Sequence, residues 1–503
     1  MRRWGYVALG SAIALCGCSS KSAHEGPPAD GGSEAAPADA GAETGGTSML
    51  QSLTVSTGSL RPDFDPNNQI YDITSINSIY PLTVTATATD PGATLTIQGT
   101  PATSGTPSTL TLQPKQDIAV VVTSPGSAPS TYTVHYVPSD FPQYTVQSTP
   151  DAGVGNEDVM LDPDGEYVMI VDRAGEPLYY RTFLPQQVEN FEQQTLPDGK
   201  VFYSTNVGVF DAQGWTLGVD HVMDDHFNDV GDYELLPFAQ HGALQAEGHE
   251  FLLLEEGHYV VMTFAQRTLD LSAYNPAWST QAVVMNGVFQ EVDNGSVVME
   301  WDSANVPSLY SDSYFENSFG TLQQSGIEDY LHLNSIQIDP TDQNFLVSFR
   351  HTSSIAKIDR HSGAILWTLG GKEDQFGLTA TQLFSFQHHV RKHPDGSITV
   401  FDNGNGPEAP HGTRILQFVL DEASHTVTSF QVLYTESTKL TPTGYMGSAV
   451  PLSGSRLFCG WGGWYSANLQ PAASEIINGS PVWTIQFGIP GLFAYRALPI
   501  APL

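Results

Sequence analysis

The chain has 503 residues, of which 40% are hydrophobic and only 15% are charged. Its 54 acidic side chains outnumber its 19 basic ones, which gives a formal net charge of -35 at neutral pH. A chain this acidic would be repelled by a phosphate backbone, so nucleic acid is excluded as a partner. The length predicts two or three domains with enough apolar material for a large core.

The first residues have the pattern of an export signal. Two arginines precede an apolar segment, residues 4–15, that is too short to span a membrane. Residues 15–18, Leu-Cys-Gly-Cys, then match the cleavage box of a bacterial lipoprotein. We expect a signal peptide over residues 1–17, a lipid on Cys18, and export to the periplasmic or cell-surface side of a Gram-negative outer membrane. An ordinary secretory signal is the alternative.

Residues 18–48 consist largely of Ala, Gly, Ser, Pro and acidic residues, with almost nothing apolar to bury. This composition predicts a flexible tether. Of the three cysteines, only Cys18 and Cys459 would remain after cleavage. A lipid on Cys18 would then leave no intramolecular disulfide, so stability must come from packing.

Residues 49–140 alternate β-branched and polar positions, as in LTVTATATD and IAVVVTS, with turn signals such as DPGA between them. This pattern predicts a small β-sandwich. The run LQSLTVSTGSLRPDFDPNNQIYDI and the closing STYTVHYV resemble bacterial cadherin-like or immunoglobulin-like sandwich modules. Because the segment contains no cluster of nucleophile, base or ligand residues, we expect it to be a spacer or an adhesion module.

From residue 141 to residue 503, short strand pairs recur around Asp-Gly or Asn-Gly turns, as in LDPDGEYVMIV, EVDNGSVVMEW and RKHPDGSITVFDN. Such turns supply the positive φ that a tight hairpin requires. Repeats spaced by roughly 35 to 60 residues predict propeller blades of about four strands. No stretch has the pattern of a long amphipathic helix. We therefore predict an all-β protein, a six-bladed β-propeller preceded by a small β-sandwich domain.

Three histidines mark the candidate site of the propeller. His249, His332 and His388 each stand before or at the start of a strand-like apolar run. Equivalent positions in different blades lie around one axis, so these side chains can converge at the mouth of the central channel. Imidazole can serve there as nucleophile, proton carrier or metal ligand.

Several of these segments resemble the bacterial arylsulfotransferase (aryl-sulfate sulfotransferase) family. GHEFLLLEEGHYVVMTF, DYLHLNSIQIDPTDQNFLVSFRH and FQHHVRKHPDGSITVFDNGNG follow one another as they do in that family. The most specific elements are His-x-Asn at 332–334 followed by Arg350, and Gln-His at 387–388 followed by Val-Phe-Asp-Asn-Gly at 400–404. The resemblance covers nearly all of residues 145–503.

The resemblance implies a six-bladed propeller that moves a sulfuryl group from a phenolic sulfate ester to a phenolic acceptor. It implies no nucleotide sulfate donor (PAPS), no cofactor and no metal. His388 would take the sulfuryl group covalently in a ping-pong mechanism. His332, Arg350, His249 and Asn334 would hold sulfate and handle protons at the phenolic oxygen. The chemistry agrees, because the planar guanidinium of Arg350 offers a fork of donors suited to a tetrahedral oxyanion.

The residue after His388 is His389, where the family pattern more often has Asp or Thr. Four other histidines are interpreted as neighbours of the site: His351, His389, His393 and His411. Two other functions stay open. One is a catalytically silent propeller that binds a ligand or a protein, and the other is a metal-dependent hydrolase or lyase with His249, His332 and His388 as ligands. The sequence does not determine the oligomeric state, and a homodimer is left open.

Overall fold

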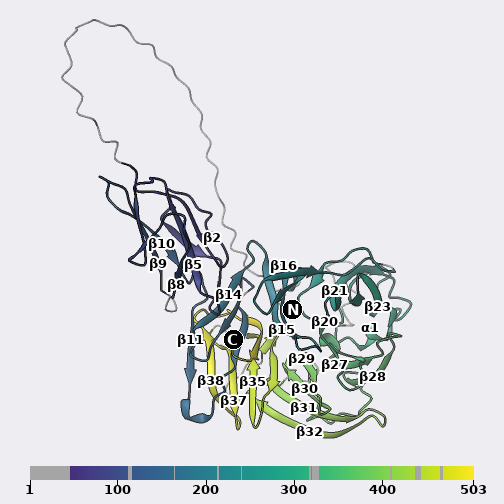
Figure 1. Cartoon of the computed structure of the whole chain (residues 1–503). Coiled ribbons are helices and arrows are strands. Elements are labelled where there is room, and N and C mark those ends of the chain that lie inside the picture. The colour runs from purple at the N-terminus through teal and green to yellow at the C-terminus, as the bar shows by residue number, and fades with distance from the viewer. Residues whose placement is uncertain are drawn as a thin grey trace, which may run out of the picture. The chain divides into compact units, whose positions relative to one another are not determined.

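The computed structural model describes residues 46–111, 116–163, 165–211, 214–239, 241–315, 319, 328–407, 411–436, 443–464 and 468–503. The predicted signal peptide, Cys18 and nearly all of the predicted tether lie outside these residues. The described regular structure is almost entirely strand, and the α-helix α1 (Ser308–Asp312) is a single short turn (Figure 1). The all-β prediction is confirmed. Within the described ranges, no helix has the length and apolarity needed to cross a membrane.

Two sheets form the sandwich predicted near the amino terminus. One contains β1 (Leu50–Val55), β5 (Leu82–Ala88) and β8 (Ser108–Leu110). The other runs in the order β2 (Leu60–Arg61), β3 (Ile70–Ile73), β10 (Ser130–His135), β9 (Ile118–Thr123), β6 (Thr94–Ile97) and β7 (Thr100–Ala102). Along β5 every second side chain is buried, as the alternation of apolar and polar residues predicts for a half-buried strand. The inward-facing residues of both sheets share one core.

Six sheets of four or five strands follow in chain order in the described part of residues 144–500. The first contains β39 (Ala494–Ile500), β12 (Asp158–Pro163), β13 (Tyr167–Val171), β14 (Pro177–Thr182) and β4 (Ser75–Asn77). The second contains β15 (Gln187–Thr195), β16 (Val201–Phe210), β17 (Thr216–Asp224), β18 (Asp229–Tyr233) and the short β19 (Ala246–Glu247). The third contains β20 (Phe251–Glu255), β21 (His258–Leu269), β22 (Ala282–Asp293), β23 (Ser296–Asp302) and β24 (Glu328–Asp329).

The remaining three sheets complete this region. The fourth contains β25 (Leu333–Ile338), β26 (Phe345–Phe349), β27 (Ser354–Ile358) and β28 (Ile365–Gly370). The fifth contains β29 (His388–Lys392), β30 (Ser397–Asp402), β31 (Arg414–Asp421) and β32 (Thr426–Thr435). The sixth contains β34 (Ser448–Pro451), β35 (Arg456–Gly460), β37 (Pro471–Ile477), β38 (Ser480–Phe487) and β11 (Tyr144–Ser148). A separate pair joins β33 (Thr443–Tyr445) to β36 (Gly463–Trp464), and 3-10 turns occupy Pro150–Ala152, Ser303–Asn305 and Arg350–Thr352.

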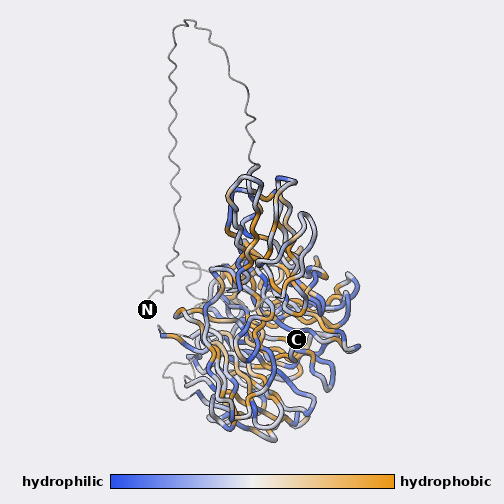
Figure 2. Tube along the Cα trace, turned by 60° about the vertical axis from the view of Figure 1, so that its left-hand side comes forward, coloured by the Kyte–Doolittle hydropathy of each residue, from blue (hydrophilic) through white to orange (hydrophobic). Residues whose placement is uncertain are grey.

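The two ends of this region exchange strands. The last strand, β39, pairs with β12 in the first sheet, and the early strand β11 pairs with β38 in the sixth. Successive sheets of about four strands, with the first and last sheets joined by exchanged strands, are the pattern that a propeller requires. Hydrophobic and hydrophilic residues are interspersed along the trace (Figure 2). Closure into six blades stays a prediction.

The predicted hairpin turns have the backbone that their sequences require. Asn294 and Gly295, between β22 and β23, have φ angles of 47° and 74°, and Asn478 and Gly479, between β37 and β38, have 51° and 77°. Positive φ at both central residues is the signature of the type I′ turn, which suits Asn-Gly and twists in the same sense as the strands.

The sandwich segment also contributes to the first of the six sheets. Strand β4 lies between β3 and β5 in the sequence, but it pairs with β14, where Ser75 lies opposite Arg181. The single proton of the Tyr180 hydroxyl is shared between the carbonyls of Ile73, at 3.0 Å, and Tyr136, at 2.8 Å. The expected spacer is therefore also a packing partner of the region that follows it.

Candidate active site

The three predicted histidines stand at corresponding places in three sheets. His249 lies just before β20, His332 and Asn334 lie at the start of β25, and His388 begins β29. Each of these three strands occupies the same edge of its own sheet. Arg350 directly follows β26 and opens a 3-10 turn. The repeat therefore delivers the three histidines to equivalent positions.

Contacts join His249, His332 and Asn334. The rings of His249 and His332 meet edge to face, with centroids 4.9 Å apart. The Tyr495 hydroxyl donates to the carbonyl of His249 at 3.1 Å and lies 3.5 Å from that of Asn334. The Asn334 amide donates to the carbonyl of Gln387 at 2.8 Å, one residue before the predicted nucleophile.

Arg350 and His388 meet at the segment that contains β33. The guanidinium Nη2 of Arg350 donates to the carbonyl of Gly444 at 3.2 Å, and the backbone N–H of Met446 donates to Nε2 of His388 at 3.1 Å. The charge of Arg350 also acts on His388, as do His249 and His332. The structure thus brings all five predicted residues to one place.

Asn403 fixes the tautomer of His388. Its amide nitrogen donates to Thr443 Oγ1 and to the carbonyl of Met446, both at 3.0 Å, so its oxygen faces Nδ1 of His388 at 2.7 Å. An amide oxygen only accepts, so Nδ1 carries the proton and Nε2 keeps its lone pair. The Met446 N–H points at that lone pair. The ring therefore offers Nε2 as its nucleophilic atom.

Burial keeps these imidazoles neutral. The side chain of His388 is nearly inaccessible, and this burial, followed by the charge of Arg350, lowers its pKa well below 6.5. Burial likewise lowers the pKa of His332 well below 6.5 and that of His249 to about 4. A neutral imidazole is the form that can attack an electrophile or accept a proton.

Two contacts hold the guanidinium of Arg350 in one orientation. The guanidinium carbon lies 4.4 Å from the centre of the Phe386 ring, a cation–π stacking distance. Its Nη1 donates to Nε2 of His351 at 2.6 Å. A guanidinium oriented on two sides can present its donors to an oxyanion without further reorganisation.

Two carboxyl groups that the sequence analysis did not select pair with the histidines. Asp329 Oδ2 accepts from Nδ1 of His332, and its Oδ1 accepts from the His332 backbone N–H at 3.0 Å. Glu247 contacts Nδ1 of His249 and accepts from its backbone N–H at 3.2 Å. Burial raises the pKa of both carboxyls, and that of Glu247 rises well above its usual value. In the sequence, the spacings Glu-Gly-His at 247–249 and Asp-x-x-His at 329–332 could have identified these two carboxyl groups.

The four histidines interpreted as neighbours have different surroundings. His351 accepts from Arg350 and contacts the carbonyl of Asp329, so it belongs to the site. The others have partners outside the site: His389 accepts from the Ala449 N–H, His393 bonds with Thr399 Oγ1, and His411 bonds with the Gly412 carbonyl.

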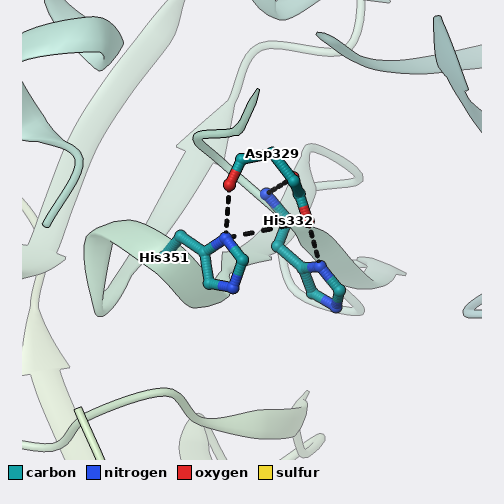
Figure 3. Close-up of side chains that lie close together, drawn as sticks. All are labelled: Asp329, His332 and His351. Atoms are coloured by element: carbon teal, nitrogen blue, oxygen red, sulfur yellow. Dashed lines mark hydrogen bonds and ion pairs between the residues drawn. The ribbon is translucent and has the colours of Figure 1, made fainter. Parts of the chain in front are cut away.

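A metal site is the alternative use of these ligand types. Asp329, His332 and His351 offer ligand atoms that all lie within 4.8 Å of one another (Figure 3). Their atoms already bond with one another, however, and the Arg350 cation donates to His351. Within the described ranges, no group with ligand spacing contains His249 or His388, which the metal hypothesis requires.

Comparison with known proteins gives distant structural likenesses. A protein of unknown function from Bacteroides caccae is 12% identical with a TM-score of 0.41, covering 69% of this chain and 100% of that chain. The β-propeller domain of Cps50 (Swd1) from Myceliophteria thermophila is 10% identical with a TM-score of 0.34, covering 68% and 85%. A catalytically inactive variant of virginiamycin B lyase from Staphylococcus aureus is 11% identical with a TM-score of 0.32, covering 68% and 99%.

No curated protein matches the chain. Family comparison is more informative. The cadherin-like beta sandwich domain family matches residues 50–137, which confirms the resemblance of that segment. The arylsulfotransferase (ASST) family matches residues 144–457, the region that holds all five candidate residues. The chain belongs to the arylsulfotransferase family.

Proposed function

We propose that this protein is an aryl-sulfate sulfotransferase that works by a ping-pong mechanism through a sulfohistidine at His388, within a six-bladed propeller. Family membership supports sulfotransferase chemistry on an aryl sulfate and a phenol. One observation carries the proposal further. Asn403 holds the proton of His388 on Nδ1, so Nε2 keeps its lone pair, and the charge of Arg350 acts on the same ring.

In the first half-reaction, Nε2 of His388 attacks the sulfur of the aryl sulfate. The bond from sulfur to the phenolic oxygen breaks, and its electron pair leaves with that oxygen as phenolate or, after protonation, as phenol. The sulfuryl group takes the place of the hydrogen bond that Met446 now donates to Nε2. Arg350 offsets the charge on the sulfuryl oxygens, and Asn403 accepts from the ring as it becomes cationic.

In the second half-reaction, an acceptor phenol loses its proton to a neutral imidazole of the site. The phenolic oxygen then attacks sulfur, the nitrogen–sulfur bond breaks, and His388 regains its lone pair. His332 and His249 are the candidates for this role, because burial lowers both pKa values and so leaves the rings unprotonated. The stored proton returns to the phenolate that leaves in the next cycle, which balances the overall exchange.

A chromogenic aryl sulfate tests this function. The purified protein should release the coloured phenol faster when a second phenol is present, and the second phenol should become sulfated. Release that is independent of any acceptor would mark a sulfatase. Tight binding of the ester without release would favour the silent propeller, and activity lost on chelation and restored by zinc would favour the metal-dependent enzyme.

We further propose that the protein is exported and anchored through a lipid on Cys18. The support is the Leu-Cys-Gly-Cys box at residues 15–18, followed by the polar segment up to residue 48. Such an anchor would hold the site outside the cytoplasm, where a transferase that needs no nucleotide donor can still work.

A further inference from the structure

Asp329 contacts two histidines of the site, His332 and His351, and its carboxylate also lies 3.7 Å from Nδ1 of His351. Its side chain bonds with Nδ1 and with the backbone N–H of His332, and its carbonyl lies 2.5 Å from Nδ1 of His351 (Figure 3). The other ring nitrogen of His351 lies 2.6 Å from Nη1 of Arg350. Asp329 thus contacts His332, a candidate proton carrier, directly. It is linked to Arg350, the candidate sulfate-binding residue, through the ring of His351.

The chemistry of its two partners assigns the tautomer of His351. A guanidinium only donates, so Nε2 of His351 must be the acceptor. A backbone carbonyl only accepts, so Nδ1 must carry the proton. His351 is therefore a neutral ring that connects Arg350 to the Asp329 backbone in one orientation. Burial lowers the pKa of His351 to about 3, which agrees with a neutral ring.

The same reasoning assigns the tautomer of His332. The Asp329 carboxyl accepts from the His332 backbone N–H, and although burial raises its pKa, the charge of Arg350 favours its ionised form. Nδ1 of His332 then donates to the carboxylate, and Nε2 keeps the lone pair. Among the described residues, none hydrogen-bonds with this Nε2. It is the atom that can accept a proton.

The backbone here is also held in a strained form. His332 has a φ of 51°, which is uncommon for a residue with a side chain. The Asp329 bond to its N–H and a bond from the Arg350 N–H to its carbonyl, at 3.0 Å, fix that conformation. Strain of this kind persists where the surrounding contacts over-determine a site.

We propose that Asp329 and His351 are positioning residues for sulfuryl transfer, and this proposal rests on the function proposed above. Asp329 sets the tautomer of His332, so that its Nε2 takes the proton of the acceptor phenol. His351 holds the Arg350 guanidinium toward the sulfuryl oxygens. These two roles are the first and the second arm of the proposal. Both involve Asp329, but the first concerns proton transfer from the acceptor phenol and the second concerns the sulfuryl oxygens, so experiments can separate them.

Asp329→Asn tests the first arm. The amide can donate to Nδ1 of His332, which would move the ring proton to Nε2 and remove the base, while the backbone carbonyl that binds His351 stays in place. With a weakly acidic acceptor phenol, transfer from the sulfated enzyme should fall about 10²–10⁴-fold. With a nitrophenol acceptor, which is already largely ionised at neutral pH, the loss should be far smaller. A merely structural role would lower the rate with both acceptors equally.

His351→Met and His351→Gln test the second arm. Methionine fills the space but is only a weak acceptor for Arg350, so phenol release in the first half-reaction should fall about a hundredfold, whatever the acceptor. Glutamine has both an acceptor and a donor, and it should restore most of that rate. His393→Gln is the matched control, because the His393 ring bonds with Thr399 Oγ1, outside the site, and it should behave as wild type.

Nitrogen-15 NMR of labelled histidine gives a readout that is independent of turnover. Wild type should show neutral His332 and His351 with the proton on Nδ1, and Asp329→Asn should move that of His332 to Nε2. Equal losses with both acceptors, or unchanged tautomers, would overturn the proposal. If wild type transfers no sulfuryl group at all, the proposed function is wrong, while the NMR result still decides the tautomer assignment.

Discussion

Replacing Asn403 with leucine should slow the first half-reaction while leaving the fold in place. Asn403 is fully buried, and its side-chain oxygen is the acceptor for Nδ1–H of His388. Leucine has a similar size but no acceptor. The ring would then either bury an unpaired N–H or move its proton to Nε2, and the second choice removes the nucleophile.

The expected size follows from the charge that develops on the ring. As Nε2 bonds to sulfur, the imidazole becomes cationic, and a hydrogen bond that involves a charged group contributes about 1.5–3 kcal/mol. At about 1.36 kcal/mol for each factor of ten, Asn403→Leu should slow sulfation of the enzyme about 10- to 150-fold. Asn403→Asp keeps an acceptor at Nδ1 and should lose less, although it gives up the donors to Thr443 and Met446.

The assay is the burst of coloured phenol from an aryl sulfate mixed rapidly with the enzyme in the absence of acceptor. Circular dichroism and denaturant unfolding should show that both variants remain folded. An unchanged burst rate in folded Asn403→Leu, or a larger loss in Asn403→Asp, would refute the role assigned to this hydrogen bond.

Three further predictions follow from other parts of the molecule. Because burial lowers the pKa of His388 well below 6.5, the burst rate should hold as the pH falls through 6.5 and decline only at lower pH; a midpoint near 6.5 would contradict a buried nucleophile. Tyr180→Phe should lower the free energy of unfolding by about 1–3 kcal/mol, because the carbonyls of Ile73 and Tyr136 lose the donor that they share. The exposed Tyr274→Phe should change it little in the same denaturant titration. Cys18→Ala should move the protein from the membrane fraction to the soluble fraction or block its processing, and unchanged membrane partition on fractionation would contradict the lipid anchor.

Local patterns were enough to predict most of the fold. Alternating apolar residues predicted strands such as β5, and Asn-Gly at 294–295 predicted a tight hairpin, because both signals depend on neighbours in the sequence. The pairing of β4 with β14 was not predictable in this way. The three residues of β4, Ser-Ile-Asn, carry no strong strand pattern, and their partner lies about a hundred residues further along the chain.

Part of the candidate site could likewise be predicted from the sequence, and part of it could not. The predicted histidines and Arg350 stand in short motifs that the sequence displays, and Glu247 and Asp329 lie close enough to their histidines to have been found. Asn403 reaches His388 because β29 and β30 pair, and Tyr495 comes from the last strand of the chain. The role of His351 depends on which atoms its two ring nitrogens face, and only the structure gives that.

Mass spectrometry of the enzyme after reaction with donor alone tests the central claim most directly. The quench must be alkaline, since a sulfuryl group on an imidazole nitrogen is labile in acid. We expect one sulfuryl adduct, on the peptide that carries His388, which disappears when a phenol is added and is absent from His388→Ala. Turnover that survives in His388→Ala, or an adduct on another residue, would contradict the sulfohistidine mechanism.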